Sequence, residues 1–212
     1  MLKRIKSILR PAVRYCRNTV TARRINQMCK QEKSLKLVIG ASGVCPQGWL
    51  PIEQYFLDLR YEQDWEKRFG GKAIKAILVE HVWEHLTVAE GEIAARLCYK
   101  YLQHGGYMRI AVPDGYHPDP DYIAMVRPGG SGLGADDHKS LYTIDSLGEV
   151  FRQAGFSIKP LEYFDADGDF HAEKWDAADG MVFRSRQYDE RNIGGELKFT
   201  SVIIDAVKPL KQ

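Results

Sequence analysis

Short apolar runs, separated by turn residues and by longer amphipathic stretches, organise this chain. The first run covers residues 35–39 and ends in Gly40 and Gly43. Apolar runs of this length, bounded by glycine, predict buried strands of a parallel sheet. Further runs predict strands at residues 49–53, 55–59, 74–79, 107–112, 156–164 and 198–207.

Helical periodicity occupies much of the sequence between these strands. Thr87, followed three residues later by Glu90, forms a capping-box pattern that predicts a helix over residues 88–103. Thr143 or Asp145 is the expected start of a second helix, over residues 146–154, and residues 61–69 predict a short third one before a glycine pair. Strands that alternate with helices indicate an α/β fold with a mostly parallel sheet. The strand–turn–strand pattern at the C-terminal end adds an antiparallel edge strand.

The first half of the sheet has unusually short connections. Parallel strands need a crossover of about a dozen residues, usually a helix. Only residues 41–48 separate Gly40 from the run that begins at Trp49, and only Gln54 separates the next two runs. The sequence therefore predicts a Rossmann-like sheet that is truncated in its first half and lacks two crossover helices. One sheet face would be bare there, and we expect the N-terminal helix to cover it.

The charges divide the chain into a basic arm and an acidic body. Residues 1–36 contain eleven Lys and Arg and one acidic residue, a net charge of +10, whereas the remainder carries −8. Within residues 1–30 the apolar positions recur at helical spacing. We interpret residues 1–34 as a basic helical arm and residues 35–212 as the folded domain. The arm is either a helix packed on the domain, a peripheral contact with anionic membrane, or a transit peptide.

Composition limits the class of protein and its partners. The hydrophobic fraction of 44% and the charged fraction of 27% are typical of a soluble globular protein. The acidic body argues against nucleic acid as a partner. Four cysteines without a C-x-x-C pair indicate a reducing compartment, so we expect a cytoplasmic protein, with membrane-peripheral contact as an alternative.

Candidate binding groups follow the predicted strands. In an open α/β sheet, ligands bind at the carboxyl ends of the strands. The turn formed by Gly40, Ala41 and Gly43 would bring backbone amides close to a ligand. Glu53 and Asp58 stand at the ends of the next two runs and offer carboxylates at the same edge.

The ordered set of motifs resembles the class I S-adenosylmethionine (SAM)-dependent methyltransferases, and within them a compact bacterial branch of predicted methyltransferases. The resemblance covers roughly residues 35–208. It rests on Leu37-Val38-Ile39-Gly40-Ala41-Ser42-Gly43, Gly48-Trp49-Leu50-Pro51-Ile52-Glu53, Leu57-Asp58-Leu59, the run from Ala76 through Glu80-His81-Val82-Trp83-Glu84-His85-Leu86, the run from Tyr101 to Asp114, and Asp137-His138-Lys139.

The resemblance implies SAM as cofactor and roles for particular residues. The amides of the glycine turn would approach the carboxylate of SAM, and Glu53 would accept hydrogen bonds from its ribose hydroxyls. Asp58 would accept from the adenine amino group. Glu80 and His81 would lie where the methionine end of SAM passes.

Methyl transfer to oxygen or nitrogen commonly needs a base that takes a proton from the acceptor. The candidates are His81, Asp114, His117 and His138, in the loops after the fourth and fifth predicted strands. The acceptor is expected to be a small molecule or a saccharide, because members of this branch often accompany sugar and cell-envelope genes. The alternative is a non-catalytic binding or scaffold protein on a degenerate methyltransferase fold.

A second motif overlaps the same region. His81, Glu84 and His85 match the H-x-x-E-H pattern of one group of zinc peptidases. That site needs both histidines on one face of a helix and a third ligand. Because the motif comes directly after a strand and before the Thr87 cap, we expect no metal site and a packed His85.

Overall fold

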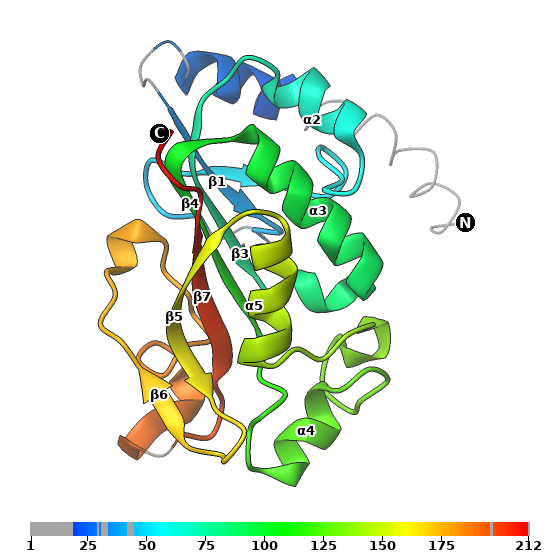
Figure 1. Cartoon of the computed structure of the whole chain (residues 1–212), viewed down its shortest axis with the longest axis vertical. Coiled ribbons are helices and arrows are strands. Elements are labelled where there is room, and N and C mark those ends of the chain that lie inside the picture. Colours follow the sequence, from blue (N-terminus) through cyan, green and yellow to red (C-terminus); the bar gives the residue numbers. More distant parts are fainter. Residues whose placement is uncertain (1–18, 29, 31–33, 42–44, 196, 212) are drawn as a thin grey trace, which may run out of the picture.

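A seven-stranded sheet forms the centre of the protein (Figure 1). The computed structural model describes residues 19–28, 30, 34–41, 45–195 and 197–211. The strands are β1 (Leu35–Ile39), β2 (Leu50–Ile52), β3 (Ile74–Glu80), β4 (Leu102–Pro113), β5 (Ser157–Phe164), β6 (Phe170–Ala172) and β7 (Ser201–Val207). Their order across the sheet is β2-β1-β3-β4-β7-β5-β6.

The sheet is parallel in its first part and antiparallel at its other edge. Strands β2, β1, β3 and β4 are parallel neighbours. Strand β7 runs antiparallel between β4 and β5, and β6 closes this edge as the second strand of a hairpin with β5. The predicted mostly parallel sheet with an antiparallel edge is confirmed.

Helices follow the sequence signals closely. Thr87 accepts a hydrogen bond from the Glu90 amide, and the Glu90 side chain caps in return, as predicted. Thr143, rather than Asp145, caps the later helix through a reciprocal pair with Ser146. The α-helices are α2 (Glu62–Phe69), α3 (Val88–Tyr101), α4 (Pro120–Val126) and α5 (Ile144–Gln153), and the 3-10 turns are η1 (Trp83–His85), η2 (Ala135–Asp137), η3 (Ala177–Asp179) and η4 (Glu190–Gly195).

The two faces of the sheet are covered differently. Alternate residues of β1, β3, β4 and β7 point into a large core that also contains buried residues of α2, α3 and α5, including Trp65, Cys98 and Phe151. The other face presents Val38, Leu78, Ala111 and Ile203, and these pack against Trp49 and Val182 in a second core. In the described part of the chain no helix longer than a 3-10 turn covers this second face; residues 175–182 of the β6–β7 connection lie on it.

A buried arginine fastens that connection to the sheet. Arg109 on β4 donates two hydrogen bonds to the Asp205 carboxylate on β7, at 2.8 and 2.9 Å. Its remaining amino group donates to the carbonyl oxygens of Gly180 at 2.7 Å and Asp176 at 3.1 Å. The guanidinium also lies over the Trp175 ring. This second face of the sheet is therefore covered by a segment that polar contacts hold in place.

Two predicted segments differ from the structure. Residues 55–59 are turns rather than a strand, because the Glu53 carbonyl accepts hydrogen bonds from the amides of Phe56 and Leu57 and turns the chain immediately after β2. The apolar side chains of this segment are buried in the large core, so the hydrophobic run reflects the packing of a turn and not a strand. Residues 115–140, which read as a long loop, contain α4 and η2.

The described part of the N-terminal arm is helical. Residues 19–28 and 30 form helix, and Ile25 is buried in the core on the α2, α3 and α5 face. Ala22 and Met28 pack against the same core. The expectation that this helix covers the open face is wrong for these residues, because their apolar side chains meet the helical layer. Residues 1–18 lie outside the described residues, and the division of the chain at residue 34 stays a prediction.

None of the helices in the described part of the chain has the length and hydropathy needed to cross a bilayer.

Candidate functional site

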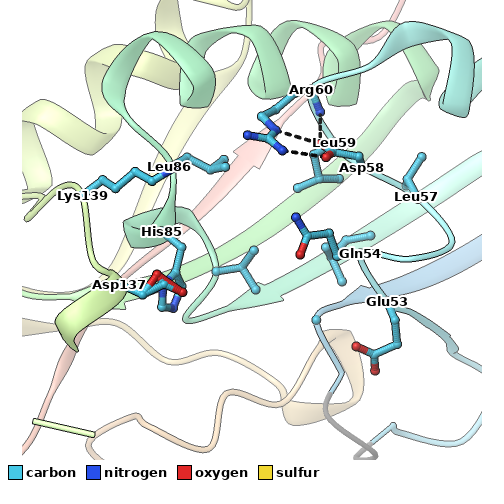
Figure 2. A pocket seen from close by; sticks show the side chains of 13 residues that line it. Glu53, Gln54, Leu57, Asp58, Leu59, Arg60, His85, Leu86, Asp137 and Lys139 are labelled. Carbon is cyan, nitrogen blue, oxygen red and sulfur yellow. Dashed lines mark hydrogen bonds and ion pairs between the residues drawn. The ribbon is translucent and has the colours of Figure 1, made fainter. Parts of the chain in front are cut away.

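Three adjoining pockets lie at the carboxyl ends of β1, β2 and β3. The Glu53 pocket, of about 420 Å³, is lined by Glu53, Gly40, Asp58 and His85 among others (Figure 2). The His138 pocket, of about 380 Å³, shares His85 with it. The Glu80 pocket, of about 320 Å³, shares Gly40 with the Glu53 pocket. The three form one cleft at the edge where parallel α/β sheets bind ligands.

Gly40 makes the turn at the start of this cleft. Its φ of +67° lies in the left-handed region, which glycine adopts without steric cost. A Cβ atom at this position would lie 2.5 Å from Val82 Cγ2. The Gly40 amide bonds the carbonyl of Ile52, which ties the turn to β2. Ala41 lines the Glu80 pocket, whereas Gly43 lies outside the described residues.

Glu53 follows β2 directly and is part of the Glu53 pocket. Its backbone carbonyl is used in the turn that follows, and Figure 2 shows its carboxylate at a distance from the Asp58 and Arg60 side chains. No residue in the described ranges hydrogen-bonds this carboxylate. Glu53 can therefore accept hydrogen bonds from a ligand.

Asp58 is held by a neighbour that the sequence motifs did not include. Arg60 donates two hydrogen bonds to its carboxylate, from Nε at 2.9 Å and from Nη2 at 2.7 Å (Figure 2). The hydrogen bonds from Arg60 lower the pKa of Asp58. Arg60 also pairs with Glu90, so it joins the pocket wall to the start of α3. Both Asp58 oxygens are thus engaged before any ligand is bound.

Glu80 binds the backbone of a distant segment. Its two carboxylate oxygens accept hydrogen bonds from the amides of Arg184 at 2.8 Å and Phe183 at 3.1 Å. This contact places residues 183–184 beside the ends of β1 and β3, where they line the Glu80 pocket. Glu80 therefore builds the wall of the cleft in the described structure.

His81 has an unusual backbone conformation and two polar contacts. Its φ is +51°, in the left-handed region that non-glycine residues rarely adopt. Its Nε2 lies 3.0 Å from Ser201 Oγ, and that hydroxyl donates its single proton to the Arg184 carbonyl. Ser201 therefore accepts from Nε2–H, and the His81 Nδ1 points at Glu84 Oε1, 3.0 Å away.

Glu84 lies at the centre of a histidine cluster. Its side chain is 1% exposed, and burial raises its pKa, but the attraction of His81 and His85 together with hydrogen bonding to its carboxylate holds the pKa below the ordinary value. His138 Nε2 lies 4.0 Å from Glu84 Oε1. The rings of His85 and His138 meet edge to face, with centroids 4.9 Å apart. The H-x-x-E-H residues thus lie on a strand end and the 3-10 turn η1 rather than on an α-helix.

His85 is less enclosed than expected. Its side chain is 32% exposed, and its Nδ1 lies 3.3 Å from Asp137 Oδ2. It lines both the Glu53 pocket and the His138 pocket, so it stands at their junction.

Two of the four candidate bases, His117 and Asp114, do not line these pockets. His117 stacks on Tyr122 with centroids 3.9 Å apart, and its Nδ1 accepts a hydrogen bond from the Asp119 amide. Burial lowers the pKa of His117. Asp114 accepts hydrogen bonds from the amides of Tyr116 and Phe164, and burial raises its pKa to about 6. His138 borders the cleft, where its Nδ1 donates to the Val126 carbonyl, and His81 lines two of the pockets.

Several cleft residues carried no sequence signal. Arg184, Arg191 and Phe199 line the His138 pocket and come from the region between β6 and β7, which shows no periodicity. Arg60 is an ordinary basic residue in sequence, and only its position beside Asp58 reveals its part in the site.

No family model and no curated protein matches the sequence. Among solved structures the chain is similar to a SAM-dependent methyltransferase from Archaeoglobus fulgidus, with 15% identity over 89% of this chain and 94% of that chain, at a TM-score of 0.45. It is similar to a possible histamine N-methyltransferase from Thermotoga maritima, with 12% identity over 98% and 96% of the two chains, at a TM-score of 0.46.

A third similar structure is an O-methyltransferase family protein from Burkholderia thailandensis, with 11% identity over 78% of this chain and a TM-score of 0.45. The chain spans 37% of the length of that protein. Similarities this distant do not assign an activity to this chain.

Proposed function

We propose that this protein is a SAM-dependent methyltransferase of the compact bacterial branch that its motifs resemble, acting on an unidentified small-molecule or saccharide acceptor. The observation that carries the proposal is the Glu53 pocket at the carboxyl ends of parallel strands. It is lined by the Gly40 turn, by Asp58 and by Glu53, whose carboxylate no residue in the described ranges engages.

The chemistry of this pocket suits SAM. Gly40 permits the left-handed turn that lies in the pocket wall, and Glu53 can accept hydrogen bonds from two vicinal hydroxyls. Leu57, Leu59 and Leu86 add apolar surface suited to an adenine ring. Asp58 would meet the adenine amino group through the lone pairs that Arg60 leaves unused, and Glu80 and His81 border the Glu80 pocket beside the turn.

The acceptor would occupy the His138 pocket. When bound, SAM supplies an electrophilic methyl group, so the tasks of the chain are to orient the acceptor and to remove its proton. His138 is the base that we favour, because His117 and Asp114 are packed away from the cleft. Arg184 and Arg191 line the same pocket and favour an acceptor with polar or anionic groups.

A scaffold or binding protein on a degenerate methyltransferase fold is the second candidate. It is favoured by the two hydrogen bonds from Arg60 that occupy Asp58, and by the absence of a crossover helix in the described residues between β1 and β2. The two candidates differ in SAM binding, which only the enzyme requires.

Calorimetric titration of SAM and of its demethylated product into the purified full chain tests the proposal. We expect binding that Glu53→Ala weakens roughly 10- to 100-fold, because a charged hydrogen bond contributes about 1.5–3 kcal/mol. Gly40→Val should abolish binding by filling the turn.

Glu149→Ala, an exposed substitution on α5 away from the three pockets, is the matched control and should bind as the wild type does. Circular dichroism confirms that each variant is folded. Binding that both pocket variants leave unchanged would refute this site, and no binding by the wild type would favour the scaffold.

A further inference from the structure

The fold brings together three metal-ligating side chains from two turns that are far apart in the sequence. One ligand atom each from Glu84, His85 and His138 lies within 4.8 Å of the other two. Glu84 and His85 come from the turn η1, and His138 directly follows η2. Ligand atoms of a tetrahedral zinc site lie about 3.4 Å apart, so small side-chain rotations would close this set around an ion.

The hydrogen bonds around His138 aim its lone pair at Glu84. Its Nδ1 lies 2.7 Å from the Val126 carbonyl oxygen, which can only accept, so Nδ1 carries the proton. In the neutral ring Nε2 then has a free lone pair, and this atom faces Glu84 Oε1 at 4.0 Å. A metal-binding histidine is usually fixed in this way, with its second nitrogen donating to a carbonyl or carboxylate.

Glu84 has fewer partners than a buried carboxylate needs. The side chain is 1% exposed, and its Oε1 pairs with His81, whereas its Oε2 has no hydrogen-bond partner within the described ranges. The nearby nitrogen atoms are His81 Nδ1 at 3.0 Å and His138 Nε2 at 4.0 Å. Ionised carboxylates are almost never fully buried unless they are paired or coordinate a metal. A cation between these groups would satisfy the carboxylate and the lone pair together.

We infer that Glu84, His85 and His138 bind a divalent transition-metal ion such as Zn²⁺ or Mn²⁺. Two imidazoles and one carboxylate favour such ions over Ca²⁺ and Mg²⁺, which prefer oxygen ligands. His81 flanks the site through its contact with Glu84, and the Asp137 carboxylate lies 3.3 Å from His85 Nδ1. The sequence predicted no metal site, because a zinc-peptidase site needs both histidines on one helix. The set inferred here is a different one, because its third ligand, His138, comes from a distant turn.

The ion would lie on the wall of the His138 pocket and beside the Glu53 pocket, because His85 borders both. A metal there could bind an acceptor hydroxyl and lower its pKa, a task that the base would otherwise perform. This consequence for the reaction rests on the proposed function, whereas metal binding itself does not.

Metal analysis of the full chain tests the inference without SAM. Protein stripped with a chelator is titrated with Zn²⁺ and with Mn²⁺, and bound metal is measured after gel filtration. We expect one ion per chain and a rise in the thermal unfolding midpoint. Glu84→Gln and His138→Ala should lose stoichiometric binding and the rise in midpoint.

His85→Ala is the variant least prone to misfold, because this side chain is partly exposed, and it should lose binding in the same way. His104→Ala removes an exposed histidine outside the cluster and should retain one ion per chain. The absorption spectrum of bound Co²⁺ would report nitrogen and oxygen ligands in the wild type. A wild-type chain without stoichiometric metal, or metal that persists in all three cluster variants, would overturn the inference.

Because the readout is bound metal, a protein that binds the ion but no SAM would refute the proposed function and leave this site intact.

Discussion

At the scale of single residues, the buried carboxyl group of Asp114 has a strongly perturbed pKa. Asp114 is fully buried, and its two oxygens accept hydrogen bonds from the amides of Tyr116 and Phe164. These bonds favour the ionised form, but burial dominates and raises the pKa to about 6. The pKa of Asp114 is thus perturbed by its structural role, and its position directly after β4 does not make it a base.

Asp114 predicts a particular dependence of stability on pH. Because its pKa is higher in the folded than in the unfolded chain, its favourable contribution is complete below about pH 4 and is lost as the pH rises through 6. The unfolding free energy of the wild type, measured relative to Asp114→Asn, should fall by up to about 3 kcal/mol between pH 4 and pH 7.

Urea denaturation at several pH values measures this difference. Asp121→Asn, at an exposed position on α4, serves as the control and should show no such slope. A difference that is flat or rises with pH would contradict the assignment.

At the scale of elements, Arg109 holds residues 175–182 against the second face of the sheet through hydrogen bonds. Arg109 is 2% exposed and joins β4, β7 and the carbonyls of the β6–β7 connection. Arg109→Met would leave Asp205 without its partner, and breaking such a buried pair typically costs about 3–5 kcal/mol. Hydrogen exchange at residues 175–182 should also become faster, because the segment loses its attachment.

Arg152→Met removes an exposed arginine of α5 and should change stability by less than about 0.5 kcal/mol. Adding Asp205→Asn to Arg109→Met should restore part of the lost stability, since it removes the unpaired charge. Unchanged exchange at residues 175–182 in Arg109→Met would show that the apolar contacts alone hold the segment.

The N-terminal helix offers a second test at this scale. Ile25 is 2% exposed and belongs to the large core, whereas Val20 in the same helix is 56% exposed. Ile25→Ala should cost about 2–5 kcal/mol in unfolding free energy, and Val20→Ala should cost far less. Removing residues 1–30 should lower the thermal midpoint, and a midpoint equal to that of the full chain would contradict a structural role for the arm.

At the scale of the whole molecule, charge is distributed very unevenly. Residues 1–36 carry +10 and the remainder carries −8. We expect the full chain to sediment with vesicles that contain anionic phospholipid at low salt, through its N-terminal residues. Binding should weaken at high salt, because screening shortens the range of the attraction from about 10 Å at 0.1 M to about 3 Å at 1 M.

Replacing Lys3, Arg4, Lys6 and Arg10 by Gln should abolish the sedimentation, and vesicles of neutral phospholipid are the matched control. Equal binding to neutral and anionic vesicles would exclude an electrostatic contact with membrane.

The sequence by itself determined the parts of this protein that depend on local physics. Apolar runs located β1, β3 and β7, because a strand buried on both faces has few polar positions. The Thr87–Glu90 pair located the start of α3, because the cap is made within four residues. The short connection after Gly40 correctly predicted that the described residues between β1 and β2 contain no crossover helix, because chain length alone limits what can fit there. The second missing crossover was inferred from a strand at residues 55–59, which the structure does not have.

The tertiary structure decided whatever depends on contacts between distant segments. The turns at residues 55–59 have the same apolar composition as a strand, and only packing beside α2 distinguishes the two. The meeting of His138 with Glu84 depends on how two turns approach each other, and the bond from Arg60 to Asp58 depends on a side-chain orientation. Side chains that are brought together only by the closing of the fold leave no pattern along a single sequence, and the histidine cluster at Glu84 is made in this way.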